Sequence, residues 1–137
     1  MPHSVNEPDG DEPRVPGQGV AVAAEALYLV NLLLLPVFGF IALLILYFRN
    51  IAQAPALAAC HLRQTLSASI WAGVLLLAVN LVIVLTGGYQ SANVWMLVII
   101  YFTICHATLV LLGVVGLAKA LAGQCYRFPF VGRARAC

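Results

Sequence analysis

The chain has 137 residues, of which 63% are hydrophobic and only 9% are charged. This composition leaves too little polar surface to cover a globular domain in water. Arg63 and Lys119 also bracket 55 consecutive residues without an acidic or basic side chain, a run that only a lipid bilayer accommodates. The composition therefore excludes an ordinary soluble domain and predicts an integral membrane protein.

Charge is distributed unevenly along the chain. The formal net charge is +2, yet all five acidic residues lie at or before Glu25, and six of the seven basic residues lie at or after Arg49. Scattered basic residues beside membrane segments do not form the clustered surface that nucleic acid binding needs. We expect no nucleic acid partner.

Residues 1–24 are predicted to form a disordered, acidic tail rich in proline and glycine. Within residues 1–19, Val5 and Val15 are the only aliphatic side chains after Met1, too few to offset the entropy lost on ordering. A secretory signal would begin with basic residues, so we expect the tail to be retained. A short basic tail, residues 131–137, is predicted at the other terminus.

The first transmembrane helix is predicted over about residues 27–48, an apolar run that ends before Arg49. Pro36 lies inside this run, and we expect it only to kink the helix, as membrane helices tolerate. Residues 49–65 mix arginine, histidine and glutamine with alanine. They predict a short interfacial helix that begins near Pro55.

Two further transmembrane helices follow. The turn-forming residues 86–93 divide the long uncharged run into a second span, about 66–86, and a third span, about 94–118. The expected fold is therefore an all-α membrane bundle over residues 25–130, with three transmembrane helices and a short interfacial helix.

Three spans place the N-terminal tail and the turn on one side of the membrane, and residues 49–65 and the C-terminal segment on the other. The first side then holds one basic residue and the second side holds six. Because cytoplasmic loops carry the excess of Lys and Arg, we expect the N-terminus outside and the C-terminus in the cytoplasm.

Two short polar motifs frame the apolar segments. Residues 60–66 (CHLRQTL) open the second span, and residues 123–130 (GQCYRFPF) follow the third. Together they resemble a family of small bacterial inner-membrane proteins of unknown function, distantly related to the twenty-kilodalton subunit of the chloroplast inner-envelope (Tic) translocon. The matching positions are His61, Arg63, Gln64 and Leu66 in the first motif, and Gly123, Tyr126, Arg127 and Pro129 in the second. The departures are Leu62, Thr65 and Phe128.

The resemblance covers about residues 27–130. It implies a multi-pass protein of the bacterial inner membrane, and it implies no chemical activity. The hairpin of the second and third spans brings the two motifs to the same membrane face. We expect an interaction surface there, formed by His61, Arg63, Gln64, Tyr126, Arg127 and Pro129, with depth anchoring by the arginine and tyrosine side chains as the alternative.

Three polar side chains are predicted within the membrane: Asn31, Asn80 and His106. An ionisable group at that depth suggests proton or metal handling. The alternative, which we favour, is a neutral His106 that hydrogen-bonds a carbonyl or an asparagine on a facing helix.

The Cys60–His61 and Cys105–His106 dipeptides raise the question of a metal site, because thiolate and imidazole are ligands for copper and zinc. The two pairs are predicted at different membrane depths, so within one chain they cannot converge on a metal. Cys105 and His106 remain the weak candidates. We expect no bound metal or cofactor, and we expect reduced cysteines rather than a disulfide framework.

Small residues one turn apart favour close helix packing on the second and third spans. They are Ser69, Gly73, Gly113, Gly116 and Ala120. The packing could be within the chain or between copies.

The sequence offers no catalytic pair, because every carboxylate lies in the outer tail or at Glu25, at the junction of the tail with the first span. We therefore expect a non-enzymatic accessory or assembly subunit that binds the lipid bilayer and either a larger membrane protein or further copies of itself. An oligomeric transporter, channel or translocon-like component is the first alternative. A metal or redox carrier that uses the Cys-His pairs is the second.

Overall fold

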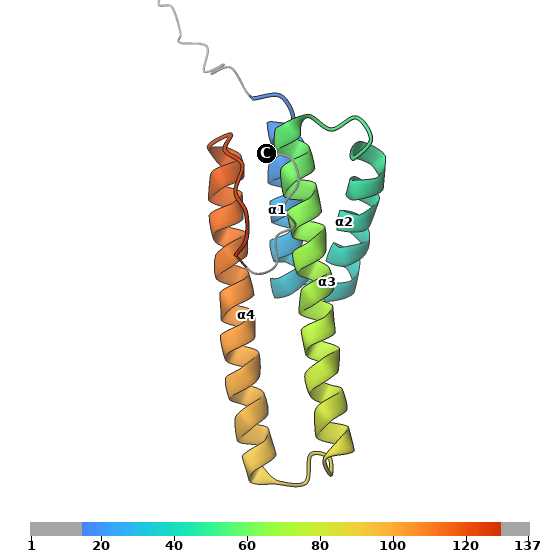
Figure 1. The fold of residues 1–137 in the computed structure, drawn as a ribbon, viewed down its shortest axis with the longest axis vertical. Coiled ribbons are helices and arrows are strands. Elements are labelled where there is room, and N and C mark those ends of the chain that lie inside the picture. The colour runs from blue at the N-terminus through green and yellow to red at the C-terminus, as the bar shows by residue number, and fades with distance from the viewer. Residues whose placement is uncertain (1–14, 130–137) are drawn as a thin grey trace, which may run out of the picture.

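The computed structural model describes residues 15–129, which contain four α-helices and no strand. They are α1 (Gln18–Leu33), α2 (Pro36–Asn50), α3 (Ala56–Leu85) and α4 (Ala92–Leu121). The two 30-residue helices α3 and α4 form a long antiparallel hairpin, and α1 and α2 pack against one half of it (Figure 1). We call the end where α1 and α3 begin and α2 and α4 end the closed end of the bundle.

The predicted first span is wrong, because the chain turns back in its middle. Proline lacks the N–H that would continue the helix and disfavours helical geometry in the residue before it. Accordingly α1 ends at Leu33, Leu35 has non-helical dihedral angles (φ −135°, ψ 79°), and Pro36 opens α2. A Cβ at Gly39 would lie 2.6 Å from the Cα of Asn31, so only glycine lets the two helices approach this closely.

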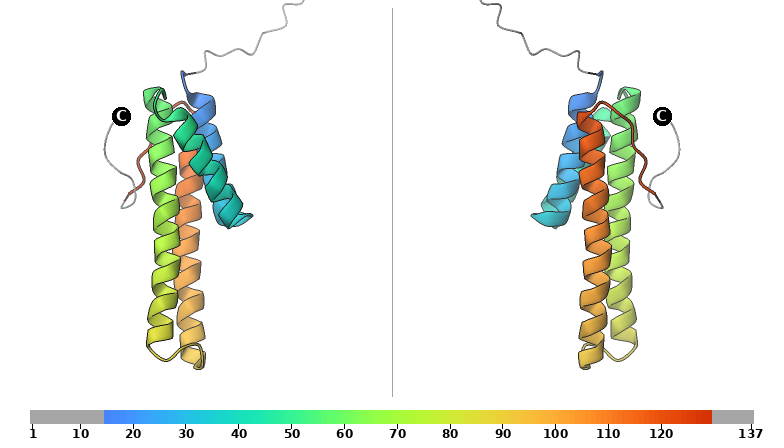
Figure 2. Two further views of the ribbon diagram at one scale, coloured as in Figure 1. Left: turned by 90° about the vertical axis from the view of Figure 1, so that its right-hand side faces the viewer. Right: turned by 90° about the vertical axis from the view of Figure 1, so that its left-hand side faces the viewer.

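The helical hairpin formed by α1 and α2 reaches only part of the way along α3 and α4, as the two side views show (Figure 2). The two helices have 16 and 15 residues, which is too short for either to cross a bilayer alone. By contrast, α3 and α4 are long and apolar enough to do so. Among residues 15–129, two helices rather than the predicted three are therefore long and apolar enough to span a membrane.

The predicted interfacial helix is not a separate element. Residues 51–55 form a loop, and residues 56–65 are the first turns of α3. Pro55 does precede a helix start, but the helix is the long one. The expected turn lies between α3 and α4, where the Ser91 hydroxyl accepts a hydrogen bond from the Asn93 N–H (3.2 Å) and caps α4.

The N-terminal part also differs from expectation. Residues 18–24, predicted as tail, form the first turns of α1, where Ala21 and Ala24 are fully buried. Residues 1–14 of the predicted N-terminal tail, and the C-terminal tail predicted over residues 131–137, lie outside the described residues.

The two ends of the described chain meet at the closed end, since the Gln18 side chain donates a hydrogen bond to the Leu121 carbonyl (2.6 Å). The described residues therefore start and finish at the same end of the bundle, which disagrees with the predicted three-span arrangement. The reason is the α1–α2 hairpin, which returns the chain to the side from which it started.

Burial is concentrated where all four helices meet. Fully buried apolar residues include Tyr28, Leu43, Leu62, Ala68 and Phe128. Over the remainder of α3 and α4 most side chains are apolar and exposed, and only 11% of the most apolar stretch of each helix is buried. These two helices are therefore not the covered core of a soluble fold within this chain.

Candidate functional site

A carboxylate and an imidazole face each other inside the closed end. Glu25 lies in the middle of α1 and His61 lies one turn and a half into α3. Glu25 Oε1 is 2.6 Å from His61 Nδ1, and both side chains are 0% exposed. Buried charged groups are rare unless they are paired, so this contact is the most distinctive polar feature of the molecule.

The contact of the second ring nitrogen of His61 shows how many protons the Glu25–His61 pair holds. His61 Nε2 lies 3.1 Å from the backbone carbonyl of Gln124, which can only accept a hydrogen bond. Nε2 therefore carries a hydrogen. The short contact between Nδ1 and Glu25 Oε1 then needs one more proton, held either by an imidazolium or by a carboxylic acid. The pair thus shares a single proton between two buried atoms.

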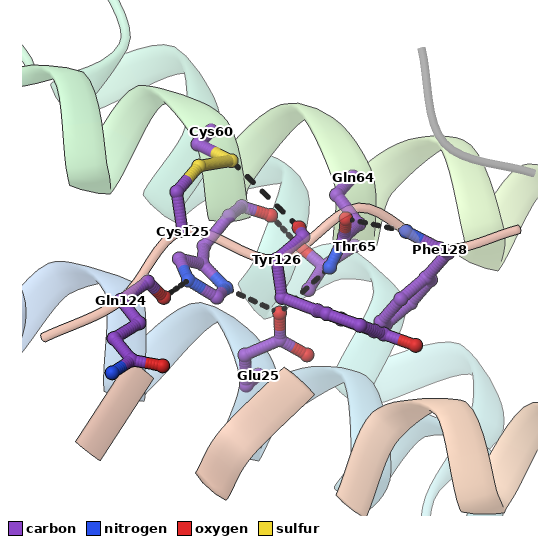
Figure 3. The surroundings of a disulfide bond; sticks show 9 residues. Glu25, Cys60, Gln64, Thr65, Gln124, Cys125, Tyr126 and Phe128 are labelled. Carbon is purple, nitrogen blue, oxygen red and sulfur yellow. Dashed lines mark hydrogen bonds and ion pairs between the residues drawn. A yellow bond between two sulfur atoms is a disulfide. The ribbon is translucent and has the colours of Figure 1, made fainter. Parts of the chain in front are cut away.

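Gln64 completes the polar cluster from the next turn of α3. Its amide nitrogen donates to Glu25 Oε1 (3.3 Å), and its amide oxygen accepts from the backbone N–H of Phe128 (2.9 Å). The two bonds fix which end of the amide faces the carboxyl group. Figure 3 shows Glu25, Gln64 and Phe128 in this arrangement.

The segment after α4 runs back along α3 and closes the cluster. Gln124 and Phe128 both bond to α3 side chains, and the Phe128 ring packs 5.8 Å from the Tyr28 ring. The Tyr28 hydroxyl donates to the Leu109 carbonyl (3.1 Å) and ties α1 to α4. Residues 123–129 therefore form a strap, which we call the C-terminal strap.

A disulfide joins the strap to α3. The Sγ atoms of Cys60 and Cys125 are 2.02 Å apart, and the bond closes a loop with a sequence separation of 65 (Figure 3). The expectation of reduced cysteines is wrong for this pair, because the strap folds back onto the first turns of α3. Cys105 is a free cysteine.

Glycines on α4 make room for α1. A Cβ at Gly116 would lie 2.5 Å from Glu25 Oε2, and one at Gly113 would lie 2.7 Å from the Tyr28 ring. Ala120, one turn further, is fully buried against Ala21. This row of small residues therefore packs within the chain, on α1.

Burial dominates the electrostatics of Glu25, which lies on α1 and outside the two helices long enough to cross a membrane. Burial raises the pKa of its carboxyl group, while the hydrogen bond and charge of His61 and the hydrogen bond of Gln64 lower it. The net pKa shift is upward, so this carboxyl group holds a proton more readily than an exposed one. Glu25 Oε2 is buried without a hydrogen-bond partner among residues 15–129.

The predicted interaction residues divide into two groups. His61 and Gln64 are buried and bond to the strap and to Glu25, so their polar atoms do not face outward. Arg63, Arg127 and Pro129 are exposed, and Tyr126 is half-buried. The structure does bring both motifs together, through contacts inside the chain.

The three polar residues expected within the membrane lie apart from the cluster. The Asn80 amide bonds to the Leu76 carbonyl (2.7 Å) and accepts from the Tyr89 hydroxyl near the turn. His106 stacks on Phe102 at 5.2 Å rather than bonding to an asparagine. Asn31 and His106 both line a lateral groove, together with Ser69 and Gly73.

The predicted first span would separate Glu25 from His61, whereas the structure places the two side chains in contact. Glu25 is thus the acid that makes a carboxylate–imidazole pair with His61, contrary to the expectation that no such pair exists. A weak signal was present, because Glu25 is the one acidic residue inside an apolar helical run. Since the pair is sealed from solvent, a dissolved substrate cannot touch it, and its chemistry here is to share a proton and join three segments.

The described residues offer no set of side chains for a metal site. Within residues 15–129 no group of three or more His, Cys, Asp or Glu side chains is placed to hold a metal ion. Cys60 is also engaged in the disulfide, so it cannot serve as a thiolate ligand beside His61.

Comparison of the chain with models of protein families, with curated proteins and with solved structures gives no match.

Proposed function

We propose that the protein is a small non-enzymatic subunit of the bacterial inner membrane, which supports the assembly of a larger membrane protein through the exposed apolar faces of α3 and α4. One observation carries this proposal: Glu25, His61 and Gln64 bond to one another and to the strap inside the closed end, whereas most of α3 and α4 is apolar and uncovered. Lipid and partner helices are the surroundings that such a surface fits.

The distribution of basic residues supports an orientation. Arg49, Arg63, Lys119 and Arg127 all belong to the closed end, while the turn between α3 and α4 carries no charged residue. The positive-inside rule then places the closed end, with the C-terminal strap, in the cytoplasm and the turn outside.

The disulfide is the observation that opposes this orientation, because disulfides are rare in the reducing cytoplasm. We give more weight to the basic residues, since they act while the chain inserts and a disulfide can form only afterwards. In this orientation the Cys60–Cys125 disulfide lies on the cytoplasmic side, where cellular thiols can reduce it.

Site-specific photocrosslinking in cells tests the function. A crosslinker is placed at Leu77 or Leu111, both exposed on the spanning helices, and at buried Leu43 as the matched control. The proposal expects one stoichiometric heterologous membrane protein at the first two positions and none at the control. Crosslinks only to further copies of the chain would support the pore alternative instead, and crosslinks only to lipid would refute an accessory role.

A further inference from the structure

A lateral groove opens between the α1–α2 hairpin and the middle of α3 and α4. Its volume is about 630 Å³, within the range of small-molecule sites. Most of its wall is apolar and includes Val37, Phe40, Val74 and Phe102. A site of this size and lining accommodates a ring or a chain of hydrocarbon character.

Three polar side chains line the same groove without a partner. The Asn31 side chain is 8% exposed, and its amide makes no hydrogen bond within residues 15–129. The Ser69 hydroxyl is buried and also unbonded in the described part of the chain. The His106 ring stacks on Phe102 and forms no hydrogen bond to any described residue. Polar groups at such depth usually have partners, so donors are available here for a bound molecule.

The depth of His106 in the membrane limits which ligands the groove could bind. His106 is 14 residues from the first residue of α4, or about 21 Å along a helix of about 45 Å. It therefore lies near the bilayer midplane if α4 spans the membrane, as the proposed function states. Phosphate and carboxylate headgroups stay at the interface because a charge costs several kcal/mol at the midplane. A neutral head is required.

We propose that the groove binds a neutral membrane quinone, a flat ring with carbonyl oxygens on an apolar chain. The carbonyl oxygens accept hydrogen bonds from the amide of Asn31 and from a ring N–H of His106. The ring stacks against the aromatic side chains of the groove, among them Phe40 and Phe102. The chain leaves through the lateral opening into lipid. This inference rests on the proposed membrane location.

Quinone binding is measured with decylubiquinone, added to the protein in phosphatidylcholine nanodiscs. Replacement of Trp95 by Phe leaves Trp71, next to groove residues Ile70 and Ala72, as the fluorescent reporter. Saturable quenching is expected on top of the linear quenching caused by partition into lipid. Asn31→Leu and His106→Leu should each weaken the saturable part at least tenfold.

Asn80→Leu is the matched control, because it removes an amide of α3 that bonds elsewhere and does not line the groove. It should leave the saturable quenching unchanged. Linear quenching alone, or equal binding in all variants, would overturn the inference. Displacement of the quinone by equimolar oleate would show a site for charged acyl lipids instead.

Alkaline carbonate extraction of membranes separates this inference from the proposed function. A protein that is extracted is not integral, which overturns both. A protein that stays in the membrane yet gives no saturable quenching overturns the quinone site and leaves the proposed function standing.

Discussion

Replacing His61 by Leu is expected to destabilise the closed end strongly. The change leaves the Glu25 carboxyl group fully buried, with Gln64 as its remaining hydrogen-bond donor. It also removes the donor that the Gln124 carbonyl accepts from. Breaking a buried ion pair by deleting one partner costs about 3–5 kcal/mol. Each 1.4 kcal/mol changes an equilibrium constant about tenfold. The ratio of folded to unfolded protein should therefore fall by at least about a hundredfold.

The assay is a double-mutant cycle on the reconstituted protein, with unfolding in mixed micelles followed by circular dichroism. The variants are Glu25→Leu, His61→Leu and the double replacement. The double variant should be less destabilised than the sum of the single ones, because it removes both buried polar groups together. Asn80→Leu combined with His61→Leu is the control pair and should be additive. A coupling between Glu25 and His61 below about 0.5 kcal/mol would refute the reasoning.

Three further predictions concern the strap, the glycine contact and the orientation. Replacing Cys60 and Cys125 by Ser should lower the free energy of unfolding by about 4 kcal/mol relative to the oxidised parent, because the disulfide closes a loop with a sequence separation of 65. As a control, the reduced parent and the variant should unfold at the same denaturation midpoint. Gly116→Ala should cost about 1–3 kcal/mol by overpacking against the buried carboxyl group, whereas Gly73→Ala, with nothing within 4 Å, should cost far less; equal melting points would contradict this. A cysteine at Gln90 in the α3–α4 turn should react with a membrane-impermeant maleimide on intact cells, and protection of that cysteine would reverse the orientation.

The long helices were predictable because their signal is local. The uncharged run and the turn-forming residues after Leu85 predict the antiparallel pair that the structure contains. The prediction of the first span was wrong because hydropathy and the helix-breaking effect of Pro36 point to different structures there. Hydropathy favours one helix across Pro36, but the α1–α2 contact at Gly39 stabilises a reversal that no window average detects.

The polar cluster was harder to predict because its members are far apart in sequence. Glu25 and His61 are 36 positions apart, and Cys60 and Cys125 are 65 apart. Once the α1–α2 hairpin was read as a single span, the bilayer separated the carboxyl group from the imidazole. One error in topology therefore concealed the central contact of the site, although His61 and Gln64 had both been named among the predicted interaction residues.

The short α1–α2 hairpin has a consequence for the surrounding lipid. In the proposed orientation the cytoplasmic leaflet is displaced by four helices and the outer leaflet by two, so the cross-section of the protein narrows from one face to the other (Figure 2). On the proposed membrane location, the hairpin tip, with exposed Leu34, Leu35 and Phe38, lies in hydrocarbon rather than in water. Lipids of the two leaflets therefore meet a wedge, and many copies gathered in one patch would make the cytoplasmic face of the membrane convex.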